Sequence, residues 1–170
     1  MRKHLIAVLV ILQASCGHIP SYPSNWPAQK LIRNGECPTI SGKFLDEGVD
    51  QDGRSASLAR SLFSPGRIIT DAKFVDVKLE SSKLNVSATT PIPPPLTSVI
   101  DLLGPCVNGE ALIEDPIGEY SPEGMVTYSS RVALSIADDG SLVVRRKWIR
   151  GGLVFYVEKG AEWQKFTPLQ

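Results

Sequence analysis

Residues 132–166 read VALSIADDGSLVVRRKWIRGGLVFYVEKGAEWQKF, and this stretch decides the fold. Apolar and polar residues alternate along it, which is the period of a half-buried β-strand. The alternation is interrupted at Asp138-Asp139-Gly140, at Arg150-Gly151-Gly152 and at Lys159-Gly160. Asp-Gly and Gly-Gly pairs between alternating runs are strong hairpin signals. From Met125 onward the sequence therefore predicts four consecutive strands of an antiparallel meander.

A second hairpin precedes this meander. Residues 72–80 and 83–89 both alternate, and Ser81-Ser82 separates them. Shorter strands are predicted over 40–44 and 110–113. Residues 96–103 fit either a strand or a turn of helix, because their periodicity does not decide between the two. The proline run that precedes them, PIPPP over 91–95, predicts a rigid crossover loop; the alternative is a polyproline ligand for a partner domain.

One short amphipathic helix is predicted over 55–64, SASLARSLFS. Its apolar residues share one face, Ser55 can cap its N-terminus, and Pro65-Gly66 ends it. The acidic stretch before it, 46–53, has a glycine that would fit an EF-hand loop. In that alignment, however, the first and twelfth ligand positions are Gly48 and Ala59, which have no side-chain oxygen. This stretch is therefore predicted to be a solvated turn and not a calcium site.

The predicted fold class is mainly β. The chain has 170 residues with 13 prolines and 14 glycines, a composition that favours turns and argues against long helices. A sheet of this kind must bury one face. We therefore expect an antiparallel curved sheet or a small barrel-like meander, with one short helix across one side.

The first 16 residues, MRKHLIAVLVILQASC, are typical of a secretory signal peptide. Two cations precede an apolar run over 5–12, which is far shorter than the roughly 20 residues that span a membrane. The end of the stretch, Ala14-Ser15-Cys16, resembles the lipobox of bacterial lipoproteins, although Gln13 stands where that family usually has Leu. The resemblance implies cleavage before Cys16, attachment of a diacylglycerol and palmitate to it, and, with Gly17 next, an outer-membrane location. The alternatives are ordinary cleavage after Gly17 and a buried N-terminal helix of a cytosolic domain.

A second pattern resembles uncharacterised proteobacterial lipoproteins. In these a segment with Trp leads to Cys-Pro, Gly, an aromatic residue and Gly, followed by a short Leu-rich helix. The matching residues are Trp26, Cys37-Pro38, Gly42, Phe44, Gly48, Leu58 and Leu62. The resemblance implies no known activity.

The chain divides into three parts on this interpretation. Residues 1–15 form the signal peptide, 16–34 an extended tether, and 35–170 a single β-rich domain. Tyr22 and Trp26 lie in the tether, and we expect Trp26-Pro27 to pack on the outer surface of the domain; the alternative is contact with the membrane interface.

The three cysteines are predicted to have different fates. Cys16 is the candidate lipidation site. Cys37 and Cys106 remain in an oxidising compartment, where disulfides persist, so we predict that they form one. The alternative is two separate buried thiols.

The composition argues against several classes of function. The chain carries 18 basic and 18 acidic residues, which is no electrostatic signal for nucleic acid. Its two histidines, His4 and His18, both precede the folded domain, which argues against Ser-His-Asp and Cys-His systems and against most zinc hydrolases. We predict no catalytic residue, no metal site and no cofactor, and therefore no enzyme; an enzyme that uses carboxylates without histidine is the remaining alternative.

The densest basic stretch is Arg145-Arg146-Lys147-Trp148-Ile149-Arg150. In a strand, Arg145 and Lys147 fall on one face with Ile149, and Arg146 joins Trp148 on the other. Arg145 and Lys147 are candidates for contact with an anionic surface, either lipid headgroups or a cell-wall polymer. The alternative is a solvated strand face.

The sequence thus favours a lipid-anchored envelope protein on the periplasmic face of the outer membrane, acting through surface contacts with envelope proteins or the cell wall. A soluble periplasmic location is the alternative. The second hypothesis for its function is a carrier whose curved sheet encloses a small apolar ligand.

Overall fold

The computed structural model describes residues 20–33, 35–63, 72–91, 94–115, 126–152 and 157–169. Its elements in chain order are β1 (Ser41–Leu45), β2 (Glu47–Asp50), β3 (Ser55–Ser57), α1 (Leu58–Leu62), β4 (Phe74–Glu80), β5 (Lys83–Thr89), β6 (Leu96–Asp101), β7 (Ala111–Glu114), β8 (Val126–Ile136), β9 (Leu142–Gly152) and β10 (Val157–Phe166).

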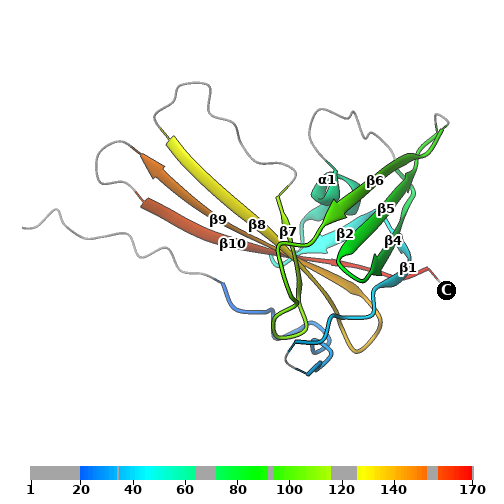
Figure 1. Cartoon of the computed structure of the whole chain (residues 1–170), viewed down its shortest axis with the longest axis horizontal. Helices are drawn as coiled ribbons and strands as arrows, with labels where there is room; N and C mark the ends of the chain where they lie inside the picture. Colours follow the sequence, from blue (N-terminus) through cyan, green and yellow to red (C-terminus); the bar gives the residue numbers. More distant parts are fainter. Residues whose placement is uncertain are drawn as a thin grey trace, which may run out of the picture.

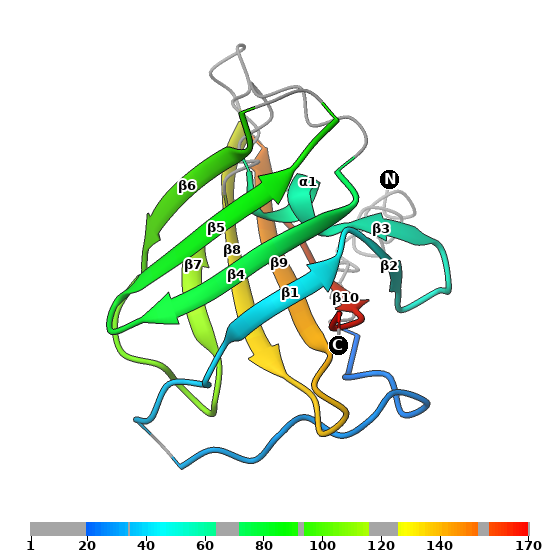
Figure 2. The same cartoon turned by 90° about the vertical axis from the view of Figure 1, so that its right-hand side faces the viewer.

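The strands form two antiparallel sheets. One has four strands in the order β1-β4-β5-β6, and the other has six in the order β3-β2-β10-β9-β8-β7. Figure 1 shows the sheets close together at one end and diverging at the other, and Figure 2 shows the four-stranded sheet in front of the six-stranded one. The mainly β class with one short helix is confirmed.

Within the described residues the sheets do not join into one closed barrel, but isolated bridges connect them at both edges of the four-stranded sheet. Phe44 of β1 bridges Pro168 after β10, and Leu102 after β6 bridges Ile113 of β7. The backbone N–H of Leu103 also donates to the carbonyl of Leu112 at 2.8 Å. The molecule is therefore a strongly curved meander with β2, β3 and α1 inserted after its first strand.

The core lies between the two sheets. Alternate residues of each strand face it, as the period of a half-buried strand requires, and α1 lies between the sheets (Figures 1 and 2). The largest fully buried side chains are Phe166, Ile40, Leu58, Leu62, Leu84, Ile113, Leu134 and Leu142.

The hairpin predicted around Ser81-Ser82 is confirmed. β4 and β5 pair from Phe74↔Thr89 to Glu80↔Lys83, and Ser81 adopts a positive φ of 56° in the turn. The turn at residues 138–140 is also confirmed, with the N–H of Ala137 donating to the carbonyl of Ser141. Of residues 96–103, whose periodicity fits either a strand or a turn of helix, residues 96–101 form the strand β6.

The predicted turn at Lys159-Gly160 is wrong. Both residues lie inside β10, which pairs without interruption with β9 from Val157↔Gly151 to Phe166↔Leu142. Likewise, β9 continues through Gly151 and Gly152. Gly160 serves packing and not a turn, because a Cβ there would overlap the Trp148 indole. The meander after residue 125 thus has three long strands and not four.

The helix predicted over 55–64 is shorter, and its start is displaced. Residues 55–57 form β3, and Ser57, not Ser55, is the N-cap, because its side chain accepts from the N–H of Arg60 at 3.2 Å. Asp46 adds a second cap by accepting from the N–H of Ala59 at 2.6 Å. No helix among the described residues is long and apolar enough to cross a membrane.

The stretch 46–53 is not the solvated turn that was predicted. Residues 47–50 form β2, and only the tip is a turn. Asp50 is buried, and its carboxylate accepts from the N–H groups of Asp52 and Arg54, both at 2.8 Å. The acidic side chain therefore stabilises its own β2–β3 turn.

The described part of the predicted tether lies along the domain. The N–H of Lys30 donates to the carbonyl of Ile136, and that of Asp138 to the carbonyl of Ala28. Trp26 packs against the small cluster of Ala137, Val143 and Trp163, on the outside of the six-stranded sheet. Residues 20–33 thus form a strap over this sheet.

Candidate functional site

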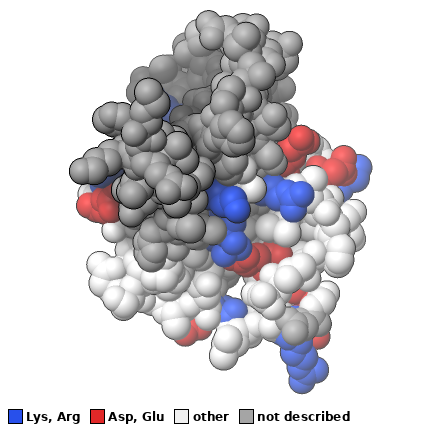
Figure 3. Space-filling model, turned by 90° about the vertical axis from the view of Figure 1, so that its left-hand side faces the viewer, with Lys and Arg blue, Asp and Glu red and all other residues white. Residues whose placement is uncertain are grey.

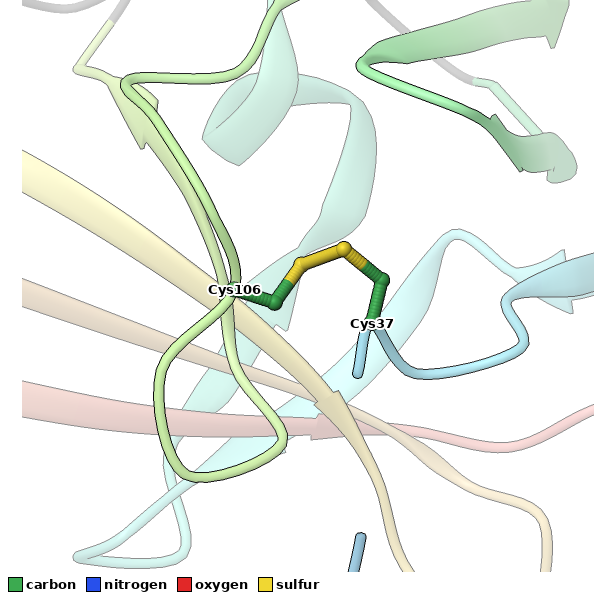
Figure 4. Close-up of a disulfide and its surroundings, with 2 residues drawn as sticks. All are labelled: Cys37 and Cys106. Atoms are coloured by element: carbon green, nitrogen blue, oxygen red, sulfur yellow. A yellow bond between two sulfur atoms is a disulfide. The ribbon is translucent and has the colours of Figure 1, made fainter. Parts of the chain in front are cut away.

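The structure describes all but one of the predicted site residues. Cys16 lies outside the described residues. Cys37 and Cys106 form the predicted disulfide, with their Cα atoms 5.0 Å apart (Figure 4). The bond ties the segment before β1 to the loop before β7, and it therefore joins parts of the chain that are 69 residues apart.

Arg145 and Lys147 lie on one face of β9 together with Ile149, as predicted. This is the outer face of the six-stranded sheet, because Arg145 packs on Trp163 there, whereas Leu142 and Val144 point into the core. The neighbouring residue Arg146 points to the inner face.

Arg145 is not a free surface cation. Its guanidinium donates to the carboxylate of Glu110, and the two side chains are 19% and 13% exposed. Its Cζ lies 5.0 Å from the centroid of the Trp163 ring, which is a cation–π distance. Its Nε is buried without a hydrogen-bond partner. Arg145 is therefore anchored, and only part of its hydrogen-bonding capacity is used.

Glu110 is the acidic member of this pair. Burial raises the pKa of its carboxyl, and Arg145 and Lys147 act in the opposite direction and lower it. No pattern in the sequence singles out Glu110, because it is 35 residues from its partner and belongs to a short turn.

A groove of about 610 Å³ surrounds the pair. Its volume is within the range of pockets that hold small ligands. The apolar part of its lining includes Val107 and Ile149, which are 50% and 47% exposed. The polar part includes Arg131 and Lys147, which are exposed and lie opposite each other on β8 and β9.

Figure 3 views the molecule from the side opposite to Figure 2, that of the six-stranded sheet. Basic side chains gather in the middle of this side, with an acidic side chain beside them (Figure 3). The groove thus combines a largely buried cation that is ion-paired, exposed cations, one carboxylate and exposed aliphatic side chains, which suits an anionic group attached to an apolar body.

A second ion pair lies on the inner face. Arg146 Nε is 3.0 Å from Asp115 Oδ2, and the two side chains are 16% and 1% exposed. Ser130 donates its hydroxyl hydrogen to the same carboxylate. This pair was not predicted either, because Asp115 and Arg146 meet only through the packing of β7 to β9.

Nothing among the described residues has the geometry of a metal site: no three His, Cys, Asp or Glu side chains lie close enough to hold an ion. Both histidines precede residue 20 and are outside the described part. Comparison with known proteins gives no family assignment, since no protein-family model, curated protein or solved structure matches the chain.

Proposed function

We propose that this protein is a lipid-anchored component of a bacterial cell envelope that acts through surface contacts and not through catalysis. The observation that carries the proposal is the Cys37–Cys106 disulfide, since such bonds persist in compartments outside the reducing cytoplasm. The apolar run over 5–12, followed by Ala14-Ser15-Cys16, supplies the second element, a lipobox-like sequence.

Cys16 is the proposed attachment site of the lipid. The proposed location is the periplasmic face of the outer membrane, and the alternative is a soluble periplasmic protein. The outer face of the six-stranded sheet is the proposed contact surface, because Arg145, Lys147 and the groove around them lie there.

The anchor is tested by labelling cells with radioactive palmitate, with and without globomycin, which blocks lipoprotein signal cleavage. The wild-type chain should incorporate label and accumulate as uncleaved precursor when globomycin is present. Cys16→Ser should abolish labelling. The other two cysteines offer a matched control, since Cys37→Ser/Cys106→Ser should still be labelled. Unchanged labelling of the Cys16→Ser variant would refute the anchor.

The carrier hypothesis is the alternative function. The described residues between the sheets form a core of fully buried aliphatic and aromatic side chains, which supports contacts at the surface over enclosure of a ligand. Titration of the full chain with a fluorescent fatty acid distinguishes the carrier hypothesis from the surface-contact hypothesis. Saturable binding that survives charge reversal on the outer face would favour the carrier.

A further inference from the structure

We propose that the outer face of the six-stranded sheet is the side of the protein that rests on the membrane, and that its cations contact anionic lipid headgroups. The inference rests on the proposed lipid anchor for the orientation, and on the charges of the described residues for the contact itself.

The first argument is the distribution of charge on β8, β9 and β10. Side chains alternate along a strand, and directly opposed residues of antiparallel neighbours point to the same side. The outward positions of these three strands therefore follow from the register with Arg145 and Trp163. Among the described side chains they hold five cations and no carboxylate: Arg131, Arg145, Lys147, Lys159 and Lys165.

Among the described residues, the carboxylates of this face lie around this group, and they include Glu47 of β2, which shares the side of Val49, the residue opposite Lys165. Glu110 neutralises Arg145, and Glu114 of the edge strand β7 lies opposite Arg131. Asp138 and Asp139 lie in the turn at one end of β8 and β9. Lys147 and Lys159 are exposed. Ile149 follows Lys147 on the same face of β9 and lies directly opposite Lys159 on β10, so an exposed apolar side chain adjoins both charges.

The opposite face of the molecule is different. On the outer face of the four-stranded sheet each of three lysines has an acidic partner: Lys43 with Asp76, Lys78 with Glu80, and Lys83 with Asp101. This face therefore carries paired charges, whereas on the other face the cations of β8, β9 and β10 form one group with the carboxylates at its margins, and an anionic membrane surface would attract that group. The field of such a surface acts within about a Debye length, roughly 8 Å at physiological ionic strength.

The second argument is the direction of the strap. It passes Ala28 beside the β8–β9 turn, and further towards the N-terminus the carbonyl of Pro20 accepts from the indole N–H of Trp163 at 3.0 Å. Trp163 is the cross-strand partner of Arg145, and Arg145 follows Asp138 by seven residues in the sequence. The chain thus runs from the acidic turn towards the basic part of this face.

The length of chain before Pro20 limits the distance to the anchor. Cys16 precedes Pro20 by four residues, and a fully extended chain covers at most about 3.5 Å per residue, so the two lie within about 14 Å. A lipid on Cys16 would therefore hold Trp163 and the adjacent cations near the bilayer surface, whereas the four-stranded sheet would face away.

The experiment reconstitutes the lipidated full chain into vesicles and measures orientation. A bimane fluorophore is attached through Lys147→Cys in one sample and through Asn85→Cys, on the outer face of the four-stranded sheet, in the other. Headgroup-spin-labelled lipid is the quencher. In vesicles with phosphatidylglycerol we expect strong quenching at position 147 and little at position 85. Equal quenching at both positions, or stronger quenching at 85, would overturn the orientation.

The charge contribution is measured with Arg131→Glu/Lys147→Glu/Lys159→Glu on the unlipidated Cys16→Ser full chain. Its partition coefficient into phosphatidylglycerol vesicles should fall at least ~10-fold, since each cation near such a surface contributes on the order of a five-fold factor. Lys78→Glu/Lys83→Glu, on the opposite face, is the matched control and should change it less than about two-fold. If neither variant changed the partition coefficient, the contact with lipid headgroups would be overturned, even if palmitate labelling had succeeded. If palmitate labelling failed, the partition measurement would still test the contact, because it uses the unlipidated chain.

Discussion

The indole of Trp148 on β9 covers Gly160 on β10, its directly opposed partner, so closely that a Cβ on Gly160 would overlap the ring. Glycine is therefore required at this position by a neighbouring side chain. The contact joins β9 and β10 in the half of their pairing that lies away from Leu142 and Phe166.

Gly160→Ala should destabilise the protein by about 1–3 kcal/mol, the usual cost of forcing additional atoms into a packed site. The measurement is the midpoint of urea unfolding followed by circular dichroism. Gly42→Ala is the matched control, because a Cβ at Gly42 would meet only the Phe44 ring at an ordinary 3.8 Å. If the two variants had the same midpoint, the Trp148 contact would not be what selects glycine.

Removal of the disulfide should cost about 4 kcal/mol. The chain-entropy estimate gives this value for a closed loop of roughly 70 residues, and the separation here is 69. The double variant Cys37→Ser/Cys106→Ser is compared with the wild type by urea unfolding, and mass spectrometry verifies that the oxidised protein lacks two hydrogen atoms. A wild type whose unfolding midpoint did not respond to a reducing agent would contradict the prediction.

Glu110 should make stability depend on pH in the acidic range. Its folded pKa is raised above the usual 4.5 by burial, in spite of Arg145 and Lys147. Between these two values the unfolded chain loses the proton and the folded chain keeps it, so the free energy of unfolding falls as the pH rises. This contribution is fully present below 4.5 and is lost as the pH rises through the folded value.

Glu110→Gln should remove this slope from a plot of unfolding free energy against pH. Glu114→Gln, at an exposed position on β7, is the control and should leave it in place. A slope of the same size in the Glu110→Gln variant would assign the pH dependence to another group.

The parts of the fold that sequence predicted are those that local patterns encode. The β4–β5 hairpin and the turn at residues 138–140 follow from alternation and from turn residues, and both signals act over a few positions. The turn predicted at Lys159-Gly160 failed because glycine has two uses, and only the packing of Trp148 distinguishes them.

The same error concealed part of the candidate site. The alternation within β9 correctly assigned Arg145 and Lys147 to one face. Lys159 joins that face only through the continuous pairing of β10 with β9, which the predicted turn would have interrupted. Glu110 reaches Arg145 across 35 residues, and no local pattern encodes such a contact.

The last prediction concerns the ion pair of Arg146 and Asp115 on the inner face. Asp115 is 1% exposed at its side chain and lies 3.0 Å from Arg146 Nε, while Arg146 Nη2 is buried without a hydrogen-bond partner. Removing one member of a buried pair leaves a charge without compensation, at a cost of about 3–5 kcal/mol, whereas replacing both by apolar residues of similar size is often neutral. Asp115→Leu should therefore destabilise the protein strongly, and Asp115→Leu/Arg146→Met should recover most of the loss.

Asp101→Ala, which removes the exposed partner of Lys83, should cost no more than about 1 kcal/mol. If Asp115→Leu were as mild as Asp101→Ala in urea unfolding, the inner pair would be solvated in solution, and the space between the diverging sheets would have to admit water at this depth.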